Sequence, residues 1–342
     1  MLCDVLDHHQ SRGAGRTRRA PCCSKQIARL DALGMASYFA SELEFYLFDE
    51  TYESVAAKDW RDLKTAGSYI QDYHILQTTK EEGVLRAIRN GLQGAGIPVE
   101  NSKGEWGPGQ EEINVRYADA LTMADWHVIL KNGCKEIAPT ASGQGDHLHG
   151  QMALRPCRLV ELTSTPRCGT TSGKTPLFLD PDGEHGMSAL DAPVRGRAAR
   201  SCARDHLVPR ALHQFLQALP GRHLRADQGD LVARQSHRRL PARAAPTRKA
   251  IRIECRIGGA DLNPYLAIAA LIAAGLAGIE QKTGAGARPC RRRLSRQEPA
   301  RGAEDAARGH RSDAWLEDAA RAFGDEVVDH YVHNAEWGAV RI

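Results

Sequence analysis

Two carboxylates stand at alternate positions in the segment FASELEFYLF, residues 39–48. Apolar side chains occupy positions 43, 45 and 47, and Glu42 and Glu44 fall between them. Side chains of a strand alternate between its two faces, so this pattern predicts a strand with both carboxylates on one face. Mg²⁺ and Mn²⁺ prefer such hard oxygen ligands. A metal site is therefore one interpretation, and a solvated strand face is the alternative.

Two further segments alternate polar and apolar residues in the same way. Residues 112–117 (EINVRY) start with Glu112, and Glu105 precedes it by seven residues in the glycine-rich stretch GEWGPGQ. Residues 252–256 (RIECR) set Glu254 between Arg252 and Arg256 at a spacing of two. The pattern indicates two more strands, each with a polar face.

Helical periodicity separates these strands. Leu85, Ile88 and Leu92 recur at helical spacing before two glycines and Pro98, and residues 118–138 predict a second helix. Asn263 before Pro264 predicts the N-terminus of a third helix, whose apolar run is 16 residues. A membrane span needs about 20 such residues. We therefore predict an α+β fold and no membrane segment.

Composition limits the class of protein and of partner. The chain has 342 residues, 42% of them hydrophobic, and a net charge of only +4. These values are typical of a globular protein and favour no nucleic-acid partner. The nine cysteines are an odd number, and the N-terminus lacks the apolar core of a secretory signal. We expect a reduced, cytoplasmic protein.

The motifs SELEFYLFDE, GEWGPGQEEINVRYADALTMAD and RIECRIGGADLNPYLAIAALIAAGLAGIEQK resemble the glutamine synthetase superfamily. The resemblance implies a catalytic domain in which an antiparallel sheet forms a funnel with packed helices. It implies an ATP-dependent ligase that activates the glutamate γ-carboxylate as γ-glutamyl phosphate and amidates it with ammonia or a small amine. Two Mg²⁺ or Mn²⁺ ions, ATP as co-substrate and a homo-oligomeric ring belong to the same expectation.

Site residues are assigned by matching the family's motifs to this sequence. The resemblance implies two groups of metal ligands and a pair of arginines that face phosphate and substrate. The first ion would be held by Glu44, Glu105 and Glu112, the second by Glu42 and Glu254, and the arginines would be Arg252 and Arg256.

Other stretches of the sequence show no period of 2 or 3.6. Residues 191–248 contain twelve Arg and no Lys, without the interleaved aromatic residues expected of a nucleic-acid-binding arm. Permitted codons for residues 161–171, shifted by one base, spell AHLHTSLWDD, which resembles the family's metal-binding histidine segment. We interpret residues 144–171, 191–248 and 283–312 as out of frame, and expect rapid amide exchange in the last two. An inactive, frameshifted remnant is therefore the alternative to an active ligase.

The resemblance also predicts a domain division. Residues 1–25 would be a remnant of a β-grasp-like N-terminal domain and its linker, with most of that domain missing. Residues 26–342 would form the glutamine synthetase-type catalytic domain.

Overall fold

A computed structural model describes most of the N-terminal half of the chain and separate segments of the remainder. Arg256 and most of the segments predicted to be out of frame lie outside the described residues. The described residues are 21–141, 148–152, 158–159, 177–178, 182, 188–190, 193–194, 231–235, 251–255, 263–281 and 319–330.

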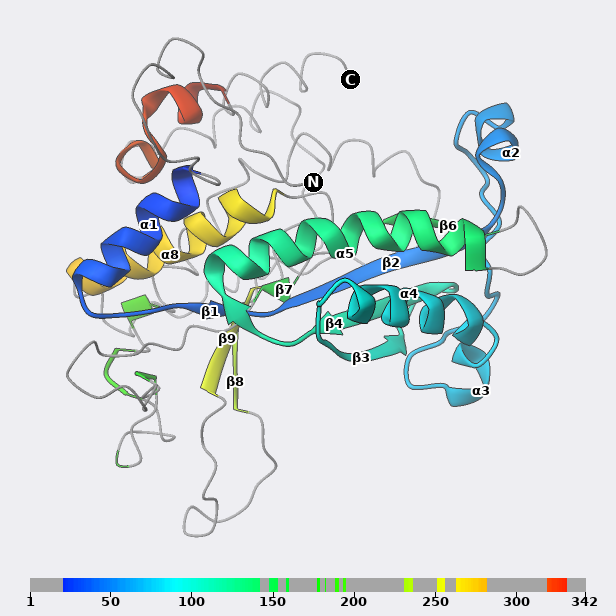
Figure 1. Ribbon diagram of the computed structural model, residues 1–342, viewed down its shortest axis with the longest axis horizontal. Coiled ribbons are helices and arrows are strands. Elements are labelled where there is room, and N and C mark those ends of the chain that lie inside the picture. Colours follow the sequence, from blue (N-terminus) through cyan, green and yellow to red (C-terminus); the bar gives the residue numbers. More distant parts are fainter. Residues whose placement is uncertain are drawn as a thin grey trace, which may run out of the picture.

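An antiparallel sheet forms the centre of the described structure (Figure 1). Its strands run in the order β3-β4-β2-β7-β9-β8, and β6 pairs with the same edge of β2 as β7, farther along that strand. A separate two-stranded sheet joins β1 (Tyr38–Phe39) to β5 (Ala118–Asp119). The main sheet consists of β2 (Ser41–Asp49), β3 (Val99–Gly104), β4 (Gln110–Val115), β6 (Leu148–Met152), β7 (Arg158–Leu159), β8 (Leu231–Gln235) and β9 (Ile251–Cys255).

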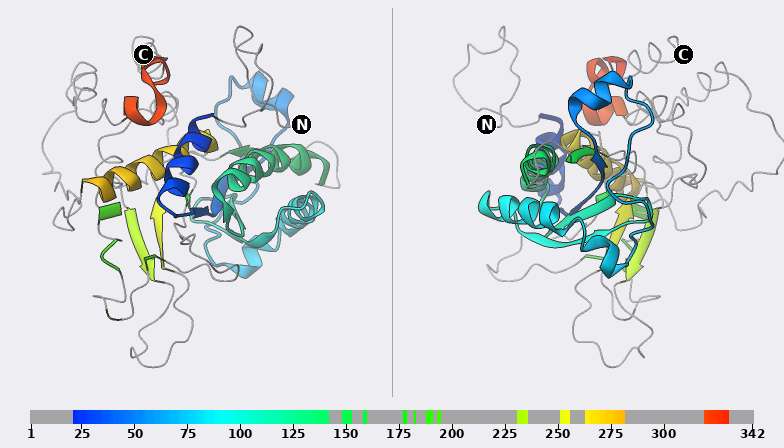
Figure 2. Two further views of the ribbon diagram at one scale, coloured as in Figure 1. Left: turned by 60° about the vertical axis from the view of Figure 1, so that its left-hand side comes forward. Right: turned by 90° about the vertical axis from the view of Figure 1, so that its right-hand side faces the viewer.

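Helices pack along this sheet and against one another. Helix α5 runs beside β2 and contacts α4 and α8, while α1 lies along α8 (Figures 1 and 2). Residues 319–323 and 325–330 are also helical. The other helices are α1 (Pro21–Ala32), α2 (Tyr52–Ala57), α3 (Ile75–Thr78), α4 (Glu82–Gly94), α5 (Ala120–Ala141) and α8 (Pro264–Glu280). The mixed architecture confirms the predicted α+β class.

The predicted alternation along β2 is confirmed by burial. Leu43, Phe45 and Leu47 are completely buried and belong to one core with Ile88 of α4 and Leu130 of α5. The carboxylates at alternate positions consequently lie on the opposite face of the strand. This core fixes which face of β2 is available for polar chemistry.

Element ends follow the sequence signals with small differences. The Asn263 side chain accepts hydrogen bonds from the backbone N–H groups of Tyr265 (3.0 Å) and Leu266 (3.3 Å), so it caps α8 as predicted. Strand β4 starts at Gln110 rather than Glu112, because its pairing with β2 extends to the Tyr46–Gln110 pair. Among the described helices, none is both long and apolar enough to cross a membrane.

Strands also occur within stretches where no period was found. Strands β6 and β7 lie inside residues 144–171, and β8 lies inside residues 191–248. Pairing with β2 and β9 gives β6 and β8 backbone hydrogen-bond partners along one edge, whatever side chains they carry. The rapid exchange expected along residues 191–248 stays a prediction. Helix α1 continues across residue 25, and the domain boundary placed there stays a prediction.

Candidate metal centre

Three of the predicted carboxylates converge on the polar face of the sheet. Glu44 of β2 and Glu112 of β4 are direct cross-strand partners. Glu105 reaches them from the turn between β3 and β4, where its N–H donates to the Gln110 carbonyl at 2.8 Å. Oxygens of the three carboxylates all lie within 4.8 Å of one another.

Gln110 connects the turn to strand β2. Its Nε2 donates to Glu44 Oε2 at 2.7 Å, while its Oε1 accepts from the Gly107 N–H at 2.8 Å and from the Tyr46 hydroxyl at 3.2 Å. The amide is almost fully buried, so these bonds are not exchanged for bonds to water. Gln110 therefore fixes both the Glu44 carboxylate and the turn that carries Glu105.

Burial raises the affinity of the Glu112 carboxylate for a proton. The pKa of Glu112 is raised to about 7, mainly by burial, then by its hydrogen bond with Glu105 and by repulsion from Glu42. Lys103 opposes this shift. The Lys103 ammonium lies 2.7 Å from Glu112 Oε2 and also forms an ion pair with Glu105.

The donor set fits a divalent cation. Within the part of the chain that the structure describes, Glu112 Oε1 is buried and accepts no hydrogen bond. Glu44 and Glu105 bring further carboxylate oxygens to the same place. Mg²⁺ and Mn²⁺ prefer such hard oxygen donors, and a cation would relieve the repulsion among the carboxylates. Glu44, Glu105 and Glu112 are therefore the residues that could hold one ion.

Glu42 and Glu254 are placed less completely. Glu42 precedes Glu44 by two residues on the same face of β2 and is half-buried, opposite Asn114. Glu254 lies on β9, which is separated from β2 by β7 alone. With strands about 4.8 Å apart, its backbone is about 10 Å from that of β2. Its side chain is not among those described, so its convergence with the others stays a prediction.

The two predicted arginines also belong to the β9 region. Arg252 is on β9 and pairs in register with Arg234 of β8. Arg256 lies outside the described residues. The structure therefore places the strand that carries Arg252 in the same sheet as the carboxylates, and the roles of both arginines stay predictions.

A second buried carboxylate lies on the opposite face of β4. Glu111 is completely buried opposite Phe45, and its Oε1 accepts a hydrogen bond of 2.6 Å from Gln71 Nε2. The same Nε2 is 3.2 Å from Glu81 Oε2. Burial, followed by repulsion from Glu81, raises the pKa of Glu111 to about 8. Glu111 is consequently protonated for the most part at neutral pH.

Sequence reasoning missed Lys103, Gln110 and Glu111. Lys103 stands two residues before Glu105, a strand spacing that places both side chains on one face. That spacing was an available signal for the Lys103 ion pairs. Gln110 and Glu111 offered none, because Gln110 bonds to Glu44 of β2 and Glu111 to Gln71, and both partners are distant from β4 in the sequence.

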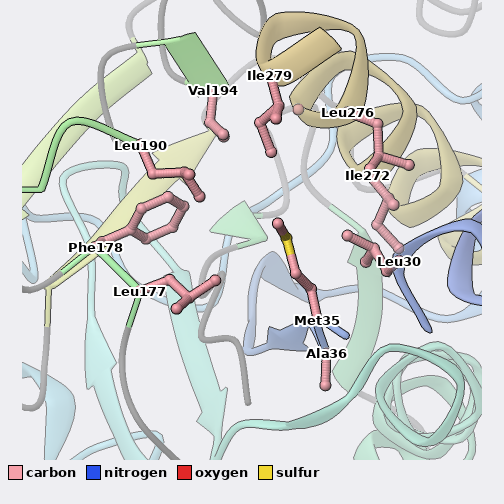
Figure 3. A pocket seen from close by; sticks show the side chains of 11 residues that line it. Leu30, Met35, Ala36, Leu177, Phe178, Leu190, Val194, Ile272, Leu276 and Ile279 are labelled. Atoms are coloured by element: carbon pink, nitrogen blue, oxygen red, sulfur yellow. The ribbon is translucent and has the colours of Figure 1, made fainter. Parts of the chain in front are cut away.

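A small apolar pocket lies elsewhere in the molecule. Leu30 of α1 and Ile272 of α8 face Phe178 and Leu190 across it (Figure 3). The Met35 side chain extends between the two groups (Figure 3). Its lining is apolar and offers no group for acid–base or metal chemistry, so the carboxylate cluster remains the candidate site.

Known proteins with the same fold are glutamine synthetase relatives. A solved glutamine synthase homolog superposes with a TM-score of 0.66 at 20% identity, over 94% of this chain and 72% of that chain. A ligand-free structure of GmaS superposes with a TM-score of 0.63 at 21% identity, over 94% and 73% of the two chains. At these identities the likeness concerns the fold alone.

Sequence comparison gives more specific relatives. The chain is 33% identical over 326 residues to γ-glutamylethanolamide synthetase of Streptomyces coelicolor, covering 90% of this chain and 64% of that protein. It is 30% identical over 273 residues to glutamate–isopropylamine ligase of a Pseudomonas species, covering 75% and 55%. Glutamine synthetase of Thermus thermophilus is 29% identical over 264 residues, covering 75% and 56%. The chain thus spans under two thirds of each relative.

The family match falls on the segments that build the cluster. The glutamine synthetase catalytic domain family matches residues 18–145 and 233–341, more than half of the chain. These ranges include β2, β4 and β9, which carry the three carboxylate motifs. The convergence of Glu44, Glu105 and Glu112 agrees with that match. This chain belongs to the glutamine synthetase superfamily, as the resemblance of its motifs implied.

Proposed function

We propose that this chain is an ATP-dependent ligase that joins a small amine, or ammonia, to the γ-carboxylate of glutamate. A γ-carboxylate oxygen attacks the γ-phosphorus of ATP, which forms γ-glutamyl phosphate and releases ADP. The amine nitrogen then attacks the acyl carbon, phosphate leaves, and the nitrogen loses a proton. The observation that carries this proposal is the convergence of Glu44, Glu105 and Glu112 in a member of this family.

The residues of the cluster would hold a divalent cation beside the transferring phosphoryl group. Glu44, Glu105 and Glu112 supply its oxygen ligands, and Glu42 and Glu254 would complete a second site. When bound, Mg²⁺ or Mn²⁺ supplies positive charge that offsets charge on the phosphoryl oxygens. Gln110 keeps the Glu44 carboxylate in place through its 2.7 Å hydrogen bond. Arg252 and Arg256 would face phosphate and substrate.

The relatives favour a small organic amine as acceptor. Two relatives with 30% identity or more are named for the amide they make or the amine they use, ethanolamide and isopropylamine. The Thermus thermophilus glutamine synthetase is 29% identical. We therefore expect ethanolamine or isopropylamine to support turnover better than ammonia does.

Phosphate release tests the proposal directly. The full chain is incubated with ATP, Mg²⁺ and glutamate, and with ethanolamine, isopropylamine or ammonia in turn. We expect phosphate release only when glutamate and an amine are both present. Glu112→Gln should lower the rate by about 10²–10³, the typical cost of losing one charge-stabilising group. Glu82→Gln, at the half-buried first position of α4, is the matched control and should keep the rate of the unaltered chain.

An inactive, frameshifted remnant is the second candidate. It rests on the sequence, because residues 191–248 show no period of 2 or 3.6, and the family match, which omits residues 146–232, does not test it. If the remnant hypothesis holds, the protein made from a gene restored so that AHLHTSLWDD returns to frame should release phosphate. The unaltered chain should not. Turnover by the unaltered chain would refute the remnant hypothesis. A restored protein that folds and binds ATP without turnover would refute the ligase assignment.

The state of the described cysteines bears on the compartment in which the protein works. Among the described residues, Cys22, Cys23 and Cys134 are free thiols, which suits a reducing compartment. We therefore place the protein in the cytoplasm, as a homo-oligomeric ring like that expected for its family. Its partners would be glutamate, ATP and the amine, without nucleic acid or membrane.

A further inference from the structure

Lys103 is in contact with the carboxylate cluster. It is the cross-strand partner of Glu112 in the β3–β4 pairing, and its ammonium lies 2.7 Å from Glu112 Oε2. The same ammonium pairs with Glu105. One lysine side chain therefore contacts two of the three carboxylates that would hold a metal ion.

The Lys103 ammonium group supplies the cluster with positive charge, as a metal ion would. When ionised, three carboxylates whose oxygens lie within 4.8 Å of one another repel unless a cation is near. Glu112 is buried, so water cannot screen it well, while Lys103 supplies positive charge at hydrogen-bonding distance. In the absence of metal, Lys103 therefore holds Glu105 and Glu112 together.

A divalent ion and the ammonium cannot share these oxygens without repulsion. Metal–oxygen distances of about 2.0–2.6 Å would bring the ion close to Lys103, whose Nζ is already in contact with the same carboxylates. The Lys103 side chain is 23% exposed, and its flexible four-carbon stem lets the ammonium move toward solvent. The side chain can thus withdraw when a metal ion enters.

We propose that Lys103 is a built-in counter-ion that competes with the divalent cation for Glu105 and Glu112. This inference rests on the proposed function, because it takes the cluster to be a metal site. The competition lowers the affinity for metal and keeps the metal-free sheet intact. Metal affinity is then set by a residue that is not itself a ligand.

Manganese binding to the full chain tests the competition. Isothermal titration with Mn²⁺ is performed on the unaltered chain, Lys103→Met and Glu112→Gln. Lys103→Met keeps an unbranched apolar stem without the charge, and we expect its Kd for Mn²⁺ to fall at least tenfold. Glu112→Gln should weaken binding. Lys64→Met is the matched control, because Lys64 is an exposed lysine paired with Asp49, and its Kd should be unchanged.

Thermal unfolding adds a readout that a purely structural lysine would not produce. Without metal, Lys103→Met should melt below the unaltered chain, because the carboxylates lose their counter-ion. Saturating Mn²⁺ should raise its Tm by more than it raises that of the unaltered chain. If Lys103→Met does not fold, Lys103→Gln, which keeps a hydrogen-bond donor, serves in both measurements.

The possible outcomes separate this inference from the proposed function. Equal Mn²⁺ affinity in the unaltered chain and both Lys103 variants, with weaker binding in Glu112→Gln, would overturn the competition but leave the metal site standing. No Mn²⁺ binding in any of these proteins would overturn the metal site itself. Tighter binding in a Lys103 variant, together with the larger Tm increase, would support the competition.

Discussion

Replacing Glu111 by Gln should stabilise the chain increasingly as the pH rises. Gln has the same shape as a protonated Glu and stays neutral. Its side-chain oxygen can accept from Gln71 Nε2, as Glu111 Oε1 does at 2.6 Å. Its amide can donate to Gln71 Oε1, which is buried without a hydrogen-bond partner among the described residues. The substitution therefore removes only the cost of ionising a buried carboxyl group.

The size of the effect follows from proton linkage. The folded-state pKa of Glu111 is about 8, raised from 4.5, so between these values the folded chain binds the proton that the unfolded chain has lost. The stabilisation that the protonated Glu111 provides is complete below the pKa of the unfolded chain. It is lost as the pH rises toward the pKa of the folded chain. At about 1.4 kcal/mol per pKa unit, the loss between pH 5 and pH 8 is about 3–4 kcal/mol.

Urea unfolding in metal-free buffer, followed by circular dichroism from pH 5 to pH 8, measures this effect. The free energies of unfolding of Glu111→Gln and the unaltered chain should differ by about 1 kcal/mol at pH 5 and by about 4 kcal/mol at pH 8. Glu112 adds its own pH dependence to both proteins, so the difference between them reports Glu111. Parallel profiles for the two proteins would refute the reasoning.

Glu82→Gln is the matched control for this experiment. Hydrogen bonds from Arg89 lower the pKa of Glu82, the opposite shift from that of Glu111. A lowered pKa contributes stability that is present above the unfolded pKa and lost only as the pH falls through the folded pKa. Between pH 5 and pH 8 the titration of Glu82 itself therefore contributes a constant amount. Glu82 also raises the pKa of Glu111 by repulsion, so the pH dependence of Glu82→Gln should be only slightly weaker than that of the unaltered chain.

Three further substitutions test the elements that position the site. Asn263→Ala removes the α8 cap and should lower the free energy of unfolding by about 1 kcal/mol in urea titrations. Gly104→Ala places a Cβ 2.6 Å from Gln71 Cβ and 2.7 Å from the Gln71 carbonyl oxygen, so β3 must shift, at a cost of about 1–3 kcal/mol measured in the same way. Gln110→Leu removes one hydrogen bond from the Glu44 carboxylate and should weaken Mn²⁺ binding in calorimetry, whereas unchanged affinity would show that Gln110 does not position it.

The sequence by itself determined the local elements and the side chains offered on each face. Alternation at positions 42–47 specified β2, and the Asn263 cap specified the start of α8. Both signals are local, because side-chain alternation and capping depend on residues a few positions apart. Convergence of Glu44, Glu105 and Glu112 was implied by resemblance, not by spacing.

Only the tertiary structure decided how those faces meet. The Glu44–Glu112 pair depends on the register between strands that are distant in the sequence, and register is set by the buried residues on the other face. Glu111 and Lys103 look like ordinary polar strand residues until the fold surrounds them. Packing then buries Glu111 against Gln71 and brings the Lys103 ammonium to Glu112. The raised pKa of Glu111 and the ion pairs of Lys103 come from burial and from nearby charges, which arise only when the chain folds.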